Sequence, residues 1–300
     1  ELQRLLQTVA QARQTRQLQA LTLIGDAGLG KSRLLRELTT ALPDCRLLTL
    51  RSQPDSQLRP WGLLRSLLAL QCGVADTDSA EVAKRKVVDT LSPWFPKRGE
   101  RQAQLIGQLS GLDFADSPTV KGLDPRTLRD QALMALRAYL QALAAAGSNL
   151  PVLIVEDLHW ADHATLELLP LLPGWLADRP VITLGSYRPE ELSRGHPLRQ
   201  ARQDLRRAGV LEELHLGSLT AENIAELVAG AVGVPVAASV TDLVHERSEG
   251  IPLYAREYVA ALCSAGKLAP NRDGLLDLVP GQGAVLPQTL RDAVLLDLDH

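Results

Sequence analysis

A glycine-rich segment near the start of the chain has the residue types and the spacing of a phosphate-binding loop. Gly25 is followed by four residues and then by Gly30, Lys31 and Ser32, which fits the pattern G-x-x-x-x-G-K-[S/T]. Glycines let successive backbone N–H groups turn toward one anion. Lys31 adds a full positive charge for the outer phosphates, and the Ser32 hydroxyl suits a magnesium ion. The pattern therefore predicts a nucleotide site.

This loop can work only between a strand and a helix. The apolar run 20–24 predicts a buried parallel strand before it, and residues 33–38 predict a helix after it. A helix that begins near Lys31 directs the positive end of its dipole at the bound anion. The residues that we expect to contact the nucleotide here are Gly25, Asp26, Ala27, Gly28, Leu29, Gly30, Lys31, Ser32 and Arg33.

Two carboxylates follow a second apolar strand. Residues 151–155 predict this strand, and Glu156 and Asp157 come directly after it. At the carboxyl end of a central strand, one acid can hold magnesium while the other orients the attacking water. The sequence leaves open which acid has which role. We therefore expect Ser32, Glu156 and Asp157 to be the magnesium ligands.

One arginine follows a further predicted strand, 181–185. Arg188 lies three residues beyond its end, where a cation can sense or stabilise charge that develops on the terminal phosphate. The alternative is a surface ion pair with Glu190 or Glu191. We expect Lys31, Glu156, Asp157 and Arg188 to be the catalytic residues.

Composition narrows the classes of function. The 300 residues are 45% hydrophobic with a net charge of −3, which gives no overall attraction to nucleic acid or membrane. Three widely spaced cysteines suggest no disulfide framework, so we expect a cytoplasmic protein. We find no apolar run long enough for a membrane span. Arg199, Arg202 and Arg206 recur at helical spacing, and we interpret them as a solvated face rather than a nucleic-acid contact.

The remaining pattern alternates strands with helices. Strands at 45–50 and 211–216 complete an α/β fold with a parallel sheet covered by helices on both faces, and a helical insertion occupies about 60–115. A long helix begins after the N-cap Asp124 and is expected to end at Gly147.

The chain divides into an expected nucleotide-binding domain, 1–217, and a small helical domain, 218–284. No strand is expected after residue 216. Residues 285–300 begin a following helical or winged-helix domain. Because the chain opens and closes inside expected helices and its only methionine is Met134, we expect an excised part of a longer protein.

The string EDLHWAD at residues 156–162, followed by TLELL at 165–169, closely resembles the extended second motif of the STAND-class ATPases. These signal-transduction ATPases with numerous domains lie near the AAA+ proteins. The resemblance is greatest to the bacterial ATPase module that is fused to transcription regulators and to class III adenylate and guanylate cyclases. Four further strings match the family in the expected order along the chain: GDAGLGKSR, LGSYRPEE, EGIPLY and LPQTLRDAV.

The resemblance implies a P-loop fold with five parallel strands in the order 5-1-4-3-2. It implies that ATP or ADP binds with Mg²⁺, that the helical domain closes over the nucleotide with Pro252 near the adenine, and that Arg188 is the first sensor residue.

The resemblance further implies a switch: ADP holds a closed state, ATP permits nucleotide-dependent self-association, and slow hydrolysis to ADP and phosphate resets it. The partners would be other domains of the same chain, with DNA contacted only through an output domain outside this sequence and no contact with a membrane. Two alternatives stay open: a conventional AAA+ motor, which should turn over fast, and a nucleotide-binding scaffold without turnover.

Overall fold

The computed structural model describes residues 1–146 and 149–279. The chain forms two compact units: the first contains Glu1–Ile24 and Leu34–Leu214, and the second contains Gly25–Arg33 and the chain from His215 onward. The expected helix end at Gly147 and the expected helix of the following domain, from Leu286, lie outside the described residues.

A five-stranded sheet forms the centre of the first unit. Its strands are β1 (Gln19–Ile24), β2 (Cys45–Arg51), β3 (Leu150–Glu156), β4 (Ile182–Tyr187) and β5 (Leu211–His215). Their order is β2-β3-β4-β1-β5, which confirms the predicted order 5-1-4-3-2. The pairs β2–β3, β3–β4 and β4–β1 are all parallel. The α/β class predicted from the sequence is therefore correct.

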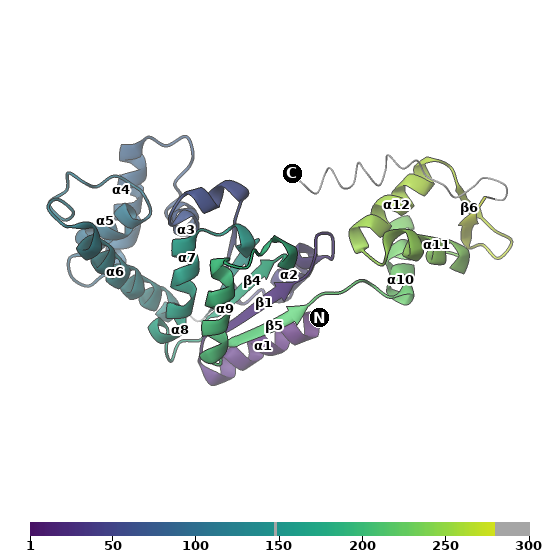
Figure 1. Ribbon diagram of the computed structural model, residues 1–300, viewed down its shortest axis with the longest axis horizontal. Helices are drawn as coiled ribbons and strands as arrows, with labels where there is room; N and C mark the ends of the chain where they lie inside the picture. The colour runs from purple at the N-terminus through teal and green to yellow at the C-terminus, as the bar shows by residue number, and fades with distance from the viewer. Residues whose placement is uncertain (147–148, 280–300) are drawn as a thin grey trace. The chain divides into compact units, whose positions relative to one another are not determined.

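The central strands are buried on both faces, as their continuous apolar runs predict. Leu21 and Ile24 of β1 point to opposite faces, because side chains alternate along a strand, and they are only 1% and 2% exposed. Helix α1 (Leu2–Thr15) lies along β1 and β5 (Figure 1). The hydroxyl of Thr8 in α1 donates to Glu212 of β5 at 2.7 Å, which fixes this helix to the sheet.

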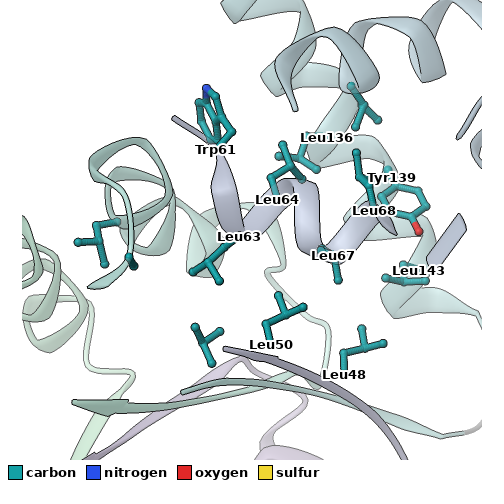
Figure 2. Packing of buried hydrophobic residues seen from close by; sticks show 14 of the residues in the cluster. Leu48, Leu50, Trp61, Leu63, Leu64, Leu67, Leu68, Leu136, Tyr139 and Leu143 are labelled. Carbon is teal, nitrogen blue, oxygen red and sulfur yellow. The ribbon is translucent and has the colours of Figure 1, made fainter. Parts of the chain in front are cut away.

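A layer of helices packs against the strands through a leucine-rich core. The predicted insertion contains α3 (Gly62–Cys72), α4 (Ala80–Leu91) and α5 (Gly99–Leu109). The other helices of the first unit are α2 (Lys31–Ala41), whose first turn belongs to the second unit, α6 (Pro125–Ala145), α7 (His163–Leu168), α8 (Leu172–Trp175) and α9 (Pro197–Arg207). Figure 2 shows Leu63 and Leu67 of α3 pointing toward β2.

Helix α6 begins where the sequence predicts. The Asp124 carboxylate accepts hydrogen bonds from the backbone N–H groups of Arg126 and Thr127, so it satisfies two donors of the first turn. The helix then buries Leu136 and Tyr139, each 1% exposed, in the core of the first unit. Burial raises the pKa of Tyr139 to about 12, so its phenol stays neutral over the physiological range.

Three helices make up most of the second unit. They are α10 (Ala221–Val232), α11 (Ala238–Ser248) and α12 (Pro252–Ser264). Their apolar faces meet in a small core of their own that includes Val240 and Leu262, both fully buried. This agrees with the helical pattern predicted after residue 216.

The expectation that no strand follows residue 216 was wrong. Strands β6 (Leu268–Pro270) and β7 (Leu276–Leu278) pair as an antiparallel hairpin. The turn between them depends on Asn271, whose side-chain oxygen accepts from the N–H groups of Asp273 and Leu275. The turn has the Asn and Gly residues typical of turns, and the two strands are too short for an alternating pattern to be visible in the sequence.

Within residues 1–146 and 149–279, no helix is both long enough and apolar enough to cross a bilayer.

Replacing Leu136 by Ala should destabilise the first unit by about 2–5 kcal/mol, because it removes buried apolar contacts and enlarges the space between the sheet and its helices. Met134 on the same helix is 64% exposed, so Met134→Ala is a matched control that should change stability by less than about 0.5 kcal/mol. All four tryptophans lie in the first unit. Urea unfolding followed by tryptophan fluorescence therefore reports on this unit, and equal effects of the two variants would contradict the described packing.

Candidate functional site

The predicted phosphate-binding loop curls around the ammonium group of its own lysine. Gly28 and Gly30 have φ angles of 78° and 90°, in the left-handed region that favours glycine. Lys31 is buried, and its Nζ donates to the carbonyl oxygens of Gly25 at 2.5 Å and of Asp26 at 2.7 Å. The loop thus holds one full positive charge at the first turn of α2, next to the N–H groups that a helix start leaves for an anion.

The second unit also places the start of α12 against this loop. The N–H of Leu253 donates to the carbonyl of Gly28 at 3.3 Å. A Cβ atom at Gly28 would lie 3.0 Å from Cγ2 of Ile251, so a side chain at this position would require Ile251 to shift by a few tenths of an ångström. Pro252 occupies the first turn of α12, where its fixed φ and missing N–H are tolerated. The loop and the predicted adenine-side residue Pro252 therefore belong to one local structure.

The acidic pair lies at the carboxyl end of β3 in the first unit. Glu156 is the last residue of the strand, and Asp157 follows in the left-handed region with a φ of 57°. Asp157 is buried, and its N–H donates to the Ser186 hydroxyl at 3.2 Å. Arg51 Nε donates to Asp157 Oδ2 at 3.0 Å. The sequence analysis missed Arg51, although its place at the end of β2 follows from the predicted strand order.

Gly185 permits the turn after the acids to pack on the neighbouring strand. A Cβ at Gly185 would lie 2.4 Å from Cδ1 of Leu158, so any side chain here would force the buried Leu158 side chain to move. Leu158 begins a short 3₁₀ turn, Leu158–Trp160, that continues the motif resembling the extended second motif. The glycine of LGSYRPEE therefore has a packing role.

Arg188 follows β4 and contacts this same turn. Its guanidinium lies 5.6 Å from the centre of the Trp160 ring, and its N–H donates to Nδ1 of His159 at 3.4 Å. Its Nη1 also lies 3.8 Å from Glu191 Oε1, so the ion pair weighed against the sensor role is present. The separation is long, and such pairs contribute little. The sensor role stays a prediction.

Asp162 holds together the starts of two helices. It is 1% exposed, and its Oδ1 accepts from the N–H groups of Trp61 at 2.8 Å and Thr165 at 3.0 Å. Its Oδ2 accepts from the N–H of Gly62 at 3.0 Å and from the Thr165 hydroxyl at 2.6 Å. One carboxylate thus caps α7 and fixes the start of α3. The sequence analysis gave Asp162 no role beyond its place in the motif.

The predicted magnesium ligands are a hydroxyl and two carboxylates. Across residues 1–146 and 149–279, no three His, Cys, Asp or Glu side chains cluster in a way that could hold a metal ion. Magnesium commonly binds through one or two carboxylates, with phosphate oxygens and water completing its octahedron. The assignment of Ser32, Glu156 and Asp157 as magnesium ligands stays a prediction.

The arginine stripe on α9 has a structural role. Arg202 and Arg206 both pair with Glu213 of β5, Arg202 at 2.6 Å. Burial raises the pKa of Glu213, but the hydrogen bonds from the two arginines outweigh it and hold the pKa below its usual value. Arg199 donates to the carbonyls of Ser193 and Leu192. These contacts account for the stripe without a nucleic-acid partner.

Replacing Asp162 by Ala should lower the free energy of unfolding of the first unit by about 2–4 kcal/mol, because four donors lose a buried acceptor. Asp162→Asn should cost less, since one oxygen remains to accept hydrogen bonds. The exposed Asp116→Ala is the control and should stay near wild type. Urea titration followed by tryptophan fluorescence measures all three, and an Asp162→Ala protein as stable as the control would rule out the capping role.

A model of the AAA ATPase domain family matches residues 1–184 of the chain. An uncharacterized protein of Rhizobium meliloti (strain 1021) is 31% identical over an alignment of 191 residues that covers 60% of this chain. The chain spans only 18% of the length of that relative.

The fold also resembles solved structures of low sequence identity. Cdc6p from Pyrobaculum aerophilum is similar over 88% of this chain and 61% of its own, with 14% identity and a TM-score of 0.50. A RuvB variant from Thermotoga maritima is similar over 87% of this chain and 60% of its own, with 17% identity and a TM-score of 0.45. For the Walker-type ATPase PABY2304 of Pyrococcus abyssi the shares are 87% and 66%, the identity 13% and the TM-score 0.43.

Proposed function

Because the chain belongs to the AAA ATPase domain family, we propose that it is an ATP-binding switch module of a larger bacterial regulatory protein, such as a transcription regulator, and hydrolyses ATP slowly. The observation that carries the proposal is the loop that follows β1. It presents glycine backbone in the left-handed region and encloses the Lys31 ammonium. A phosphate chain that enters this loop would replace the two backbone carbonyls as the partner of Lys31.

Nucleotide binding would use residues of the loop and of α12. Backbone N–H groups between Gly25 and Arg33 would hold the phosphates, with Lys31 on the outer ones. The start of α12 packs on Gly28, so Pro252 lies beside the loop and would contact the base. Bound nucleotide would therefore stabilise the contact between the loop and α12.

Hydrolysis would use the acids at the end of β3 and the arginine after β4. Ser32 and one of the acids would hold the magnesium ion that binds with the nucleotide. This ion would neutralise phosphate charge and polarise the terminal phosphate. The other acid, for which we propose Asp157, would orient the attacking water. Arg188 would stabilise charge on the terminal phosphate. Asp157 would have to exchange Arg51 for water first, which supports slow turnover.

The larger protein is part of the proposal. The Rhizobium relative extends far beyond the matched region, which supports a module that works with other domains of one chain. We propose a nucleotide-binding domain at 1–217, a helical lid at 218–284 and the start of a further domain at 285–300. Self-association would depend on the nucleotide, DNA would be bound only by another domain, and the protein would act in the cytoplasm without contacting a membrane.

Lys31→Ala should weaken binding of ATP with Mg²⁺ by about 10- to 150-fold, because a hydrogen-bonded charge contributes about 1.5–3 kcal/mol. The exposed Lys121→Ala removes the same charge elsewhere and should bind as wild type does. Calorimetric titration of nucleotide-free protein measures both. If the two variants bind equally, the loop is not the phosphate site.

Asp157→Asn should lower ATP turnover by about 100- to 10,000-fold while ATP binding changes little. Asn tolerates the left-handed backbone at this position, so the fold should be retained. Asp178 has a similar φ of 62° and is exposed, which makes Asp178→Asn the matched control. Phosphate release measures turnover, and wild-type turnover by Asp157→Asn would exclude Asp157 from the chemistry.

Glu156→Gln separates the two acids. ATP binding by Glu156→Gln and by Asp157→Asn is measured with and without Mg²⁺. The acid whose replacement removes the magnesium dependence of binding is the metal ligand. In wild-type protein, turnover well below about 1 per second supports a switch, faster turnover supports a motor, and binding without turnover supports a scaffold.

A further inference from the structure

The first unit contains an apolar cavity of about 100 Å³, partly open to solvent, between the sheet and its helical layer. Leu48 and Leu50 of β2 line one side, and Leu63 and Leu67 of α3 line the opposite side. Figure 2 shows the two α3 side chains pointing across the gap toward the two strand residues. Helix α6 completes the wall with Leu136 and Leu143 among others.

A cavity of this size is unusual in a protein core. Interiors are packed as densely as organic crystals and contain few voids larger than a water molecule. Only 3% of the residues are aromatic, so branched aliphatic side chains must fill the space between sheet and helices. Cavities lined by such groups stay dry, and an engineered one of about 150 Å³ binds benzene.

The lining specifies the chemistry of an occupant. The side chains named above offer neither charge nor a hydrogen-bonding group. Thr165 and Thr183 also line the cavity, and the Thr165 hydroxyl already donates to Asp162 at 2.6 Å. Water would find few partners there, and burying a charged or strongly polar molecule would cost free energy. The cavity therefore fits a small uncharged apolar molecule.

We propose that this cavity is a binding site for a small uncharged apolar molecule about as large as a benzene ring, and that its occupancy changes ATP turnover. The coupling follows from the lining. Val155 precedes Glu156, and Leu158 follows Asp157, and both line the cavity. A molecule packed against them would restrict the turn that carries the two acids. This coupling, unlike the binding, rests on the proposed function.

Binding is tested without nucleotide, with fluorobenzene as the probe. Its ¹⁹F signal should shift or broaden saturably with protein, and it should raise the unfolding temperature. Leu67→Phe fills the cavity and should weaken binding at least about 10-fold. Leu70 lies on the same helix and is 56% exposed, so Leu70→Phe should bind as wild type does. No saturable binding by wild type, or equal binding by Leu67→Phe, would overturn the site.

A second variant keeps the test decisive if Leu67→Phe does not fold. Leu67→Ala enlarges the cavity and should admit 1-fluoronaphthalene with higher affinity than wild type does; an unchanged affinity would overturn the assignment.

Coupling is then tested by ATP turnover with saturating fluorobenzene. Turnover should change in wild type and in Leu70→Phe but not in Leu67→Phe. A wild type that binds the probe and turns over ATP unchanged would overturn the coupling and leave the binding site in place. A wild type that binds the probe but shows no turnover at all would count against the proposed function instead.

Discussion

The register of the parallel strands is the constraint on which the rest of the first unit depends. Val155 of β3 pairs with Gly185 of β4, and Tyr187 at the end of β4 pairs with Ile24 at the end of β1. Because all three strands run in one direction, whatever follows each of them emerges at one edge of the sheet. The acidic pair and the arginine are attached directly behind β3 and β4, so a single sheet register determines where both begin.

The turn after the acids explains why a motif can be so specific without every residue touching a ligand. Asp162 accepts four hydrogen bonds that connect the start of α7 with the start of α3. Trp160 and His159 contact Arg188, and Leu158 packs where Gly185 leaves room. Each of these residue types is set by a different neighbour. The residue types of this motif are therefore set by contacts that join the helical insertion and Arg188 to the strand that carries the acids.

The sequence predicted best what depends on local pattern. Apolar runs gave the strands, the N-cap Asp124 gave the start of α6, and the glycine spacing gave the loop around Lys31. It could not predict contacts that join distant segments, such as Arg51 with Asp157, which are 106 positions apart. The β6–β7 hairpin was missed because three-residue strands are shorter than the period that reveals a strand. The domain boundaries and the roles of the site residues stay predictions.

The pair between Arg51 and Asp157 relates the architecture to the proposed rate of hydrolysis. Both residues sit at the carboxyl edge of the sheet, where β2 and β3 align Arg51 with Glu156. A buried carboxylate needs such a partner, because burying a charge alone is costly. In the proposed mechanism, the attacking water would have to compete with Arg51 for this carboxylate. The Arg51 side chain is 63% exposed, so the arginine could leave the pair into solvent. Stability of the resting site and slow turnover would thus have one physical cause.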